Sequence, residues 1–506
     1  MRKQKPIDDF SLDDQFIIRI LESNFEIYSI EISDEEIKEA ENIFILTNEY
    51  ILLTYYKLND INRYGMICNR NGEILPKTKG LILGGSKESS FSDVIVNINP
   101  EVGFLWLTDI YDPQNGISNI SWIVFSMPSS DENIIDRIVK NLDNDSISPN
   151  GESWTEYKGF PTIDGGYGIA FIGHQVKLVN NETQQTLNLN PDWTIYVTFL
   201  KYQSYKRMDL FQIYQSTSDF LSIVFRECNS AFDNGYICIM SVTSIGIPVK
   251  SGEFVISFLS SGLVMGKGIN QFNINNQILP GRQYSIDGVV SLVYGGFAII
   301  LQHDDDESIG NSICDSPNGQ QSFSKYLDLP KKFQKYENGL IYGLLPNNSL
   351  WIVQNEISTG EWSIYFFDLR QFVLDVHGYG NPYIESTYPE KDSKINLETK
   401  DISITFNAPI ALSLGDISIY QVNQPQDILR QRTSAENPAF IELSNNSFTV
   451  NVEVLISTFN MQETYYVLMD NNFVKNLTNN EPKIGIKKNK WNFTAIQLTE
   501  PKHNLP

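Results

Sequence analysis

Cysteine is scarce in this sequence. The 506 residues contain four, Cys68, Cys228, Cys238 and Cys314. Four thiols in a chain of this length exclude a disulfide-rich scaffold, and the lack of any Cys-x-x-Cys pair argues against a structural zinc site. Cys228 and Cys238 flank a predicted turn, Asn229–Gly235, so they either form a disulfide across a hairpin or remain free buried thiols. The redox compartment stays open.

Positive charge is also in short supply. Lys and Arg total 38 against 61 Asp and Glu, which gives a formal net charge of −23 and a pI near 4.6. The pairs Lys331-Lys332 and Lys487-Lys488 are isolated and do not offset this locally. Such a chain repels nucleic-acid phosphates and anionic lipid head groups, so no nucleic-acid partner is expected.

The sequence has no long apolar run. Met1–Pro6 is basic, but the Asp residues from Asp8 to Asp14 occupy the place of the apolar core of a signal peptide. The most apolar uncharged stretch, Gly288–Gln302, is shorter than the ~20 residues of a membrane helix, and two glycines interrupt it. We expect no membrane insertion in this chain. It either stays inside the cell or lacks the ends that would export and anchor it.

Aromatic residues are abundant, with 25 Tyr and 29 Phe, and only 20% of residues are charged. Short alternating apolar runs recur between turns of Gly, Asn, Asp and Pro; examples are Tyr50–Tyr56, Thr194–Phe199 and Trp362–Phe367. This pattern predicts an all-β protein. Two segments instead have helical features, Asp131–Leu142 behind a capping box at Ser129 and Asp34–Glu41 behind Ser33.

A degenerate repeat runs through the first three quarters of the chain. Its mark is a Gly beside an aromatic or apolar residue that opens a hydrophobic strand. The instances are Tyr64–Ile67, Gly103–Trp106, Asp164–Ile169, Asp233–Ile237, Gly295–Ile299 and Asn338–Tyr342. Their mean spacing of roughly 55 residues fits four-stranded blades with variable loops. We therefore predict a β-propeller over residues 12–377 with six to eight blades, seven favoured; a pair of β-sandwiches is the alternative. The repeated Gly is expected on crowded inner strands near the propeller axis.

Residues 383–496, which follow a Gly- and Pro-containing hinge, have a pattern of their own. Tyr388-Pro389 and a polar stretch precede the alternating strand Ile402–Phe406. The segment closes with the strand Tyr465–Met469, an Asp-containing turn and the strand Trp491–Thr494. These features predict an immunoglobulin-like (Ig-like) β-sandwich.

In these residues the segment resembles the Ig-like domain first described in bacterial surface-layer proteins, the SbsA type. The resemblance covers about a fifth of the chain and departs in the long polar stretch Asn423–Pro438. It implies a spacer or presentation role at a cell surface and no catalytic residues. The N-terminal part is loosely similar to propeller-like surface proteins of early-diverging fungi, in the style of its Asp-Gly-Gly-Tyr-Gly repeat.

Several segments match ion- or phosphate-binding motifs incompletely. The acidic run His303–Glu307 lacks the alternating ligands and the glycine of a calcium loop, and Asp143–Glu152 has Ile147 where a third oxygen ligand belongs. Gly80–Glu88 carries its Lys one place late for a phosphate loop. Ser148–Trp154 resembles a shortened form of the Asp-box turn of sialidase propellers, and it occurs once. We expect no metal ion and no cofactor.

Histidine is nearly absent, with His174, His303, His377 and His503 as the complete set. No Gly-x-Ser-x-Gly elbow is present, so few residues in this sequence could form a Ser/His/Asp catalytic triad. The catalytic residues are therefore unknown from sequence. His377, at the hinge, is expected to be structural.

Tryptophans and glycosylation sequons are the remaining candidates. Six Trp residues lie on or beside predicted strands, where most are expected to pack in the core and one or two to line a propeller mouth: Trp106, Trp122, Trp154, Trp193, Trp351 and Trp362. Seven Asn-x-Ser/Thr sequons permit glycosylation without arguing for it: Asn119, Asn144, Asn181, Asn347, Asn445, Asn476 and Asn492.

These features favour a non-enzymatic binding or adhesion protein, extracellular or at a cell surface. The propeller would present a surface for carbohydrate or protein, and the Ig-like segment would be the spacer. A glycan-acting hydrolase or lyase with its site in the propeller mouth is one alternative. A mouth with two or more carboxylates ~5–10 Å apart would favour that enzyme. An intracellular protein-interaction scaffold is the other alternative.

Overall fold

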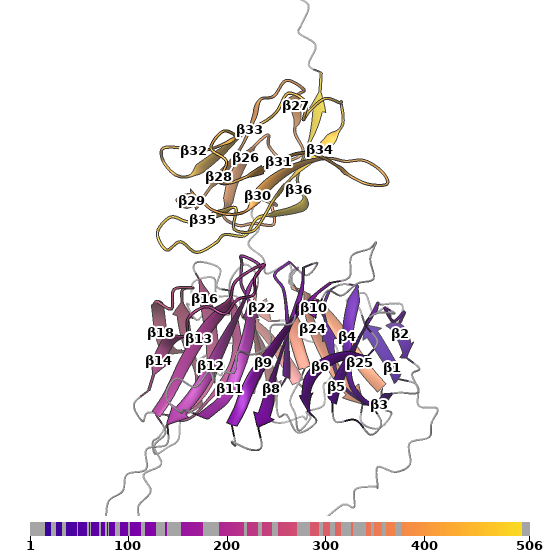
Figure 1. Ribbon diagram of the computed structural model, residues 1–506, viewed down its shortest axis with the longest axis vertical. Coiled ribbons are helices and arrows are strands. Elements are labelled where there is room, and N and C mark those ends of the chain that lie inside the picture. The colour runs from indigo at the N-terminus through magenta and orange to yellow at the C-terminus, as the bar shows by residue number, and fades with distance from the viewer. Residues whose placement is uncertain are drawn as a thin grey trace, which may run out of the picture. The chain divides into compact units, whose positions relative to one another are not determined.

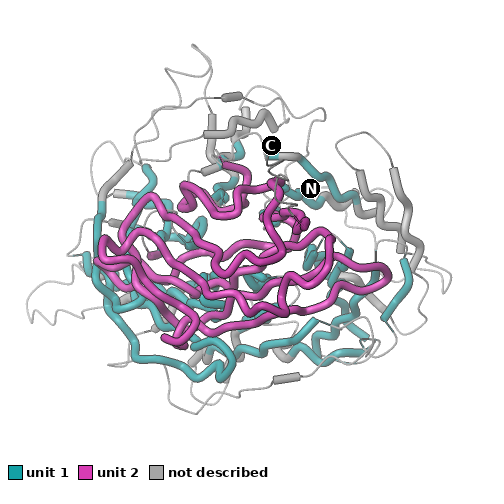
Figure 2. The backbone as a smooth tube through the Cα atoms, turned by 90° about the horizontal axis from the view of Figure 1, so that it is seen from above, with its two compact units in different colours: residues 1–232, 236–373 teal, residues 233–235, 374–506 magenta. Residues whose placement is uncertain are grey.

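A computed structural model describes residues 16–497 apart from a set of gaps. The longest gaps are 128–136, 139–152, 176–191, 271–283, 315–324 and 327–340. Every regular element in the described part of the chain is a β-strand, so the all-β prediction is confirmed. No helix long and apolar enough to cross a bilayer occurs among these residues. The chain forms two compact units (Figures 1 and 2). Unit 1 comprises residues 1–232 and 236–373, and unit 2 comprises residues 233–235 and 374–506.

Unit 1 consists of consecutive antiparallel sheets in which strands adjacent in sequence are hydrogen-bonded neighbours. The first sheet contains β3 (Ile37–Ile45), β4 (Tyr50–Lys57), β5 (Asn62–Asn69) and β6 (Leu81–Ser86). The second contains β7 (Ser92–Val96), β8 (Gly103–Asp112), β9 (Ile117–Ser126) and β10 (Arg137–Ile138). The third contains β11 (Ser153–Pro161), β12 (Tyr167–Gln175), β13 (Asp192–Leu200) and β14 (Phe211–Gln215).

Two more sheets of this kind follow. One contains β15 (Phe220–Ser230), β16 (Tyr236–Ser244), β17 (Ser251–Phe258) and β18 (Val264–Asn270). The next contains β19 (Tyr284–Ser291), β20 (Phe297–His303), β21 (Ile309–Cys314) and β22 (Lys325–Tyr326). Figure 1 shows these sheets side by side, with the long strands β11, β12 and β13 running alongside one another.

The sixth sheet joins the two ends of unit 1. Its strand order is β2-β1-β25-β24-β23, with bounds β1 (Phe16–Leu21), β2 (Ile27–Ile32), β23 (Ile341–Leu344), β24 (Ser349–Glu356) and β25 (Glu361–Asp368). β1 runs parallel to β25, with Ile18 opposite Trp362 and Leu21 opposite Tyr365. The N-terminal strands β1 and β2 therefore complete a sheet whose other three strands come from the end of unit 1.

Apolar side chains pack between neighbouring sheets. Leu52 of the first sheet packs with Trp106 of the second, and Leu53 belongs to one core with Trp351 of the sixth. Further cores join the second sheet to the third, the third to the fourth and the fifth to the sixth. The first strands β7, β11, β15, β19 and β23 each lie beside the next, which links the fourth sheet to the fifth. The core of unit 1 therefore lies between its sheets.

Three of the repeated glycines, Gly103, Gly165 and Gly235, lie at or just before the start of the second strand of their sheets. Their φ values of 147°, 91° and 78° lie in the region in which residues with a Cβ are strained. The crowding expected of these glycines occurs at Gly103, where an added Cβ would collide with the Phe125 carbonyl oxygen, and it recurs at glycines of first strands. A Cβ on Gly159 of β11 would lie 2.3 Å from the Ile95 Cδ1 of β7, and one on Gly288 of β19 would lie 2.5 Å from the Tyr342 Cζ of β23.

Neither expected helix forms in the described residues. Residues 37–41 belong to β3, whose residues pair with β4, and 34–36 lie outside the described part. Arg137 and Ile138, in the middle of the other candidate, pair with Phe125 and Val124 of β9; its other residues are also outside the described part. In both places a neighbouring strand with an open edge supplies hydrogen bonds that outweigh a modest helix propensity.

Unit 2 has two principal sheets. One has the order β26-β28-β33-β32 and contains β26 (Ile384–Tyr388), β28 (Asp401–Phe406), β33 (Thr449–Glu453) and β32 (Ile441–Leu443). The other has the order β27-β36-β34-β30-β31 and contains β27 (Lys394–Asn396), β36 (Ile486–Ile496), β34 (Thr464–Met469), β30 (Asp416–Gln421) and β31 (Ile428–Ser434). A short pair, β29 (Ile410–Leu412) and β35 (Val474–Asn476), accompanies them.

The core of unit 2 comes from the alternating positions that the sequence predicts. Ile402, Ile404 and Phe406 of β28 are fully buried. On the other sheet, the ring of Tyr465 lies 6.4 Å from that of Phe493, centroid to centroid. Side chains also bond from one sheet to the other: Gln431 Nε2 of β31 donates to the carbonyl of Glu453 in β33 at 2.7 Å. The two sheets of unit 2 therefore share one interior.

Candidate functional site

The first strands of the sheets in unit 1 bring five polar side chains together. They are Asp93 of β7, Glu156 and Lys158 of β11, Glu227 of β15 and Tyr342 of β23, and we call them the first-strand cluster. Most residues around them in these strands are apolar, so charged groups here are costly unless they have partners. The strands that carry them are neighbours in space although they are far apart in sequence.

Lys158 is at the centre of the cluster. Its Nζ lies 2.9 Å from Asp93 Oδ2, and the two side chains keep 24% and 16% of their surface exposed. Burial opposes the charged form of the lysine, but the negative charges of Asp93 and Glu227 outweigh burial and raise the pKa of Lys158 above its ordinary value. The ammonium therefore stays protonated at any physiological pH.

The two glutamates have an unusual proton affinity. Burial raises the pKa of Glu227 from 4.5 to about 7; Lys158 opposes the rise, and the charge of Asp93 adds to it. Burial also raises the pKa of Glu156 to about 7, against a hydrogen bond from the Phe225 N–H and the positive charges nearby. Both carboxyl groups therefore change protonation near neutral pH.

Two polar side chains of the cluster bond to backbone groups at the free edges of first strands. The N–H of Phe225 in β15 donates to Glu156 Oε2 at 2.8 Å. The N–H of Val289 in β19 donates to the Tyr342 hydroxyl at 3.4 Å. A strand at the edge of a sheet has backbone groups without a ladder partner, and these bonds satisfy some of them. Glu156 and Tyr342 thus stabilise the contact between neighbouring sheets.

The pKa values of Lys158 and Glu227 determine which reactions the cluster could support. Glu227 can donate or accept a proton near neutral pH, and the permanent cation of Lys158 lies in the same cluster, 2.9 Å from Asp93 Oδ2. No group of three His, Cys, Asp or Glu side chains in the described residues converges as ligands for a metal ion.

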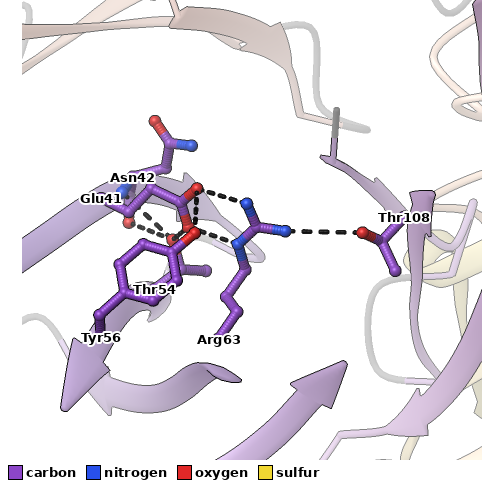
Figure 3. A network of polar contacts seen from close by, with 6 residues as sticks. All are labelled: Glu41, Asn42, Thr54, Tyr56, Arg63 and Thr108. Carbon is purple, nitrogen blue, oxygen red and sulfur yellow. Dashed lines mark hydrogen bonds and ion pairs between the residues drawn. The ribbon is translucent and has the colours of Figure 1, made fainter. Parts of the chain in front are cut away.

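A second polar constellation lies between the first and second sheets of unit 1 (Figure 3). Arg63 of β5 is 2% exposed and donates from Nε and Nη2 to the two carboxylate oxygens of Glu41 in β3, both at 2.6 Å. The hydroxyl groups of Tyr56 and Thr54 donate to the same carboxylate at 3.1 and 3.2 Å. Figure 3 shows the guanidinium between this carboxylate and Thr108 of β8 in the next sheet.

The Glu41–Arg63 network is built for stability. The guanidinium lies 5.6 Å from the Trp106 ring centroid and 5.8 Å from that of Tyr56, and it bonds to both oxygens of Glu41. Burial raises the pKa of Tyr56 to about 12, with Arg63 opposing and Glu41 reinforcing that rise. The charges are bonded to one another, so the network joins two sheets and leaves little capacity for a ligand.

Most candidate residues from the sequence analysis lie away from these two constellations or outside the described part of the chain. His303 ends β20, residues 81–86 of the segment Gly80–Glu88 form the edge strand β6, and His377 is exposed in a turn. Residues 304–307, 143–152 and His503 lie outside the described residues, as do the side chains of His174, Trp154 and Trp362. None of the described residues of these motifs belongs to the first-strand cluster.

The remaining candidates from the sequence are the tryptophans, the cysteines and the glycosylation sequons. Four tryptophans are in the core, as predicted for most of them: Trp106, Trp122, Trp193 and Trp351 are 0 to 8% exposed. Cys228 and Cys238 lie opposite each other on β15 and β16 and form a disulfide, whereas Cys68 is free and buried. Among the sequons of unit 2, Asn445 is exposed, while Asn476 and Asn492 are half-buried.

Sequence reasoning missed both polar constellations. Their signal was a charged residue inside an otherwise apolar or aromatic strand, such as Lys158 in β11, Glu227 in β15 or Arg63 in β5. Such a residue marks a buried charge that needs a partner. The partner could not be identified from sequence, because Asp93 and Lys158 belong to different sheets.

No protein-family model matches this chain, and no curated protein matches it. Solved structures do. A thermostable family-43 glycoside hydrolase is 14% identical with a TM-score of 0.32, and the match covers 58% of this chain and 95% of that one. A prolyl endopeptidase (9%, TM-score 0.34) matches over 88% of this chain and 49% of its own. The Hadza microbial sialidase Hz136 (9%, TM-score 0.34) matches over 87% and 74%. Likeness at this level carries no conclusion about activity.

Proposed function

We propose that unit 1 is a six-bladed β-propeller. The support is the succession of four-stranded sheets, the side-by-side first strands and the apolar cores between neighbouring sheets. Closure of the sixth sheet by the N-terminal strands is the expected way to fix the ends of such a ring. Six lies within the range of six to eight blades that we predict, one below the favoured seven.

For unit 2 we propose an Ig-like sandwich. The orders β26-β28-β33-β32 and β27-β36-β34-β30-β31 correspond to Ig strands A-B-E-D and A′-G-F-C-C′. Tyr465, at the start of the F-like strand, donates its hydroxyl to the carbonyl of Met461 four residues upstream at 3.1 Å. This is the bond of the tyrosine corner in Ig domains. The unit lacks an intersheet disulfide, and its buried Trp491 is on the G-like strand.

The function that fits this architecture is non-enzymatic binding or adhesion, with unit 2 as a spacer and unit 1 presenting a surface to carbohydrate or protein. The observation that supports this function is that three side chains of the first-strand cluster bond to other groups of the protein itself. Asp93 bonds to Lys158, Glu156 to a backbone N–H of the next sheet, and Tyr342 to another. These groups hold sheets together, which leaves the loops and strand ends to the ligand.

The disulfide is informative about the cellular compartment of the protein. Disulfides persist in oxidising compartments and are uncommon in the cytosol. The Cys228–Cys238 bridge therefore supports an extracellular or cell-surface protein over an intracellular scaffold.

One observation favours a second candidate, a glycan-acting hydrolase. Glu227, whose pKa is raised to about 7, and Asp93, held beside Lys158, form a pair of carboxyl groups in different surroundings, as glycoside hydrolysis requires.

One experiment separates the two functions. The full chain and its Glu227→Gln and Asp93→Asn variants are applied to a glycan array and then assayed for release of reducing sugar. Binding that survives both substitutions, without sugar release, supports the binding protein. Sugar release by the original chain that either substitution abolishes overturns it in favour of the hydrolase. An array without bound glycan removes carbohydrate as the ligand class and leaves a protein.

A further inference from the structure

One sequon of unit 2, Asn445-Asn446-Ser447, lies in the turn between β32 and β33. The Ser447 N–H donates to the Ser444 carbonyl at 2.8 Å, which closes a tight turn with Asn445 and Asn446 at its two central positions. Asn445 is exposed. A sequon in a surface turn is the setting in which a bulky, polar N-glycan can be attached and remain in solvent.

The other side chains of this turn hold its shape and leave the sequon's own groups free. Asn446 Oδ1 accepts the Ser444 hydroxyl at 2.6 Å and the Phe448 N–H at 3.1 Å. Neither the Asn445 amide nor the Ser447 hydroxyl bonds to another residue in the described part of the chain. The nitrogen that would take the sugar and the hydroxyl that completes the sequon are therefore available without the loss of an existing bond.

The sequon at Asn492 has a different environment. It lies in β36, which pairs with β34 and β27. Asn492 Nδ2 donates to the Asn489 carbonyl at 3.2 Å, and its Oδ1 is buried. The middle residue, Phe493, is 1% exposed. A transferase has to bind all three residues of a sequon, and it cannot reach these while β36 is paired and packed.

The sequon at Asn476 is intermediate between the other two. Asn476 is half-buried, although Thr478, which completes the sequon, is exposed. Asn476 Oδ1 accepts the N–H groups of Thr478 and Asn479 at 2.8 and 3.3 Å. Its side chain thus holds a turn of the backbone, and attachment of a sugar has to disturb that turn. Among the three sequons of unit 2, the fold favours Asn445.

We propose that Asn445 is an N-glycosylation site. The proposal rests on the extracellular or cell-surface location that the Cys228–Cys238 bridge supports, because N-glycosylation is a modification of secreted proteins. The co-reactant is an oligosaccharide carried on a lipid pyrophosphate. Asn445 Nδ2 forms a bond to the anomeric carbon of the sugar, and the bond from that carbon to the pyrophosphate breaks. The lipid pyrophosphate leaves with the electron pair, and the amide proton passes to a base of the transferase.

The test expresses the full chain behind a secretion leader in a eukaryotic host. Protease-resistant chains from the secretory lumen and the medium are treated with a peptide-N-glycosidase, which converts a glycosylated Asn to Asp, and peptide mass spectrometry then reads each sequon. We expect most chains to carry a glycan at Asn445, few at Asn492, and an intermediate share at Asn476. Asn445→Gln and Ser447→Ala should each remove the mass of one glycan. Ser447→Thr, the matched control, should keep it.

Three results overturn the proposal. They are an unmodified Asn445 in these chains, a higher occupancy at Asn492 than at Asn445, and a glycan at Asn445 that survives Ser447→Ala. Because the leader supplies entry to the secretory pathway, none of them tests the location on which the proposal rests. That location fails separately if Cys228 and Cys238 are found reduced in the chain purified from its native source.

Discussion

Glu156 is the residue whose replacement tests the first-strand cluster most directly. Its carboxylate accepts the Phe225 N–H at 2.8 Å, and burial raises its pKa from 4.5 to about 7. Glu156→Gln keeps an oxygen acceptor at the same place and removes the ionisable group. The substitution thus separates the hydrogen bond from the charge.

The magnitude and sign follow from proton linkage. Each unit of pKa corresponds to about 1.4 kcal/mol, so ionising Glu156 in the folded protein costs about 3 kcal/mol more than in the unfolded chain. Because the folded protein binds this proton more tightly, the group favours folding most below pH ~4.5. That contribution falls as the pH rises to about 7 and is then constant. At pH 8, Glu156→Gln should stabilise unit 1 by up to about 3 kcal/mol; at pH 4 it should have little effect.

Chemical denaturation of unit 1 at a series of pH values measures this difference, with the exposed Glu49→Gln as the matched control. The control should show no pH-dependent difference from the original chain. The reasoning is refuted if Glu156→Gln changes stability equally at every pH, or if it destabilises the protein at pH 8.

Three further predictions concern stability. Glu41→Gln leaves the buried Arg63 cation without its carboxylate and should cost about 3–5 kcal/mol; a loss below about 1 kcal/mol in denaturant titrations would contradict the network. Replacing Cys228 and Cys238 by Ser removes a bridge across ten residues and should cost about 3 kcal/mol. A reductant should lower the melting temperature of the original chain and leave that variant unchanged. Tyr465→Phe deletes one buried hydrogen bond and should lower the stability of unit 2 by about 1 kcal/mol; unchanged calorimetric unfolding would refute the tyrosine corner.

The strands of unit 2 were predictable because each one alternates. Ile402, Ile404 and Phe406 point to one face and are buried, and the expected strands Tyr465–Met469 and Trp491–Thr494 lie within β34 and β36. A period of two places one set of side chains on the core face, and this signal is local. β31 was not predicted, since it lies within the polar stretch 423–438 and its position depends on β30.

The two helix predictions failed for a related reason. Residues 37–41 have a helical apolar spacing in isolation, yet they form the first strand of a sheet in which Glu41 meets Arg63. The same residues satisfy two local patterns. The choice between them is made by β4, which offers an open edge, and by a buried guanidinium that needs a carboxylate.

The sequence by itself determined the all-β class, the acidic character and most strands of unit 2, because composition and alternation act over a few residues. Only the tertiary structure decided which charges meet. Asp93, Lys158 and Glu227 lie on three strands separated by long stretches of chain, and their pairing depends on first strands of successive sheets coming together. Electrostatic energy depends on the distance between charges and on their burial, and neither quantity is encoded in local sequence spacing.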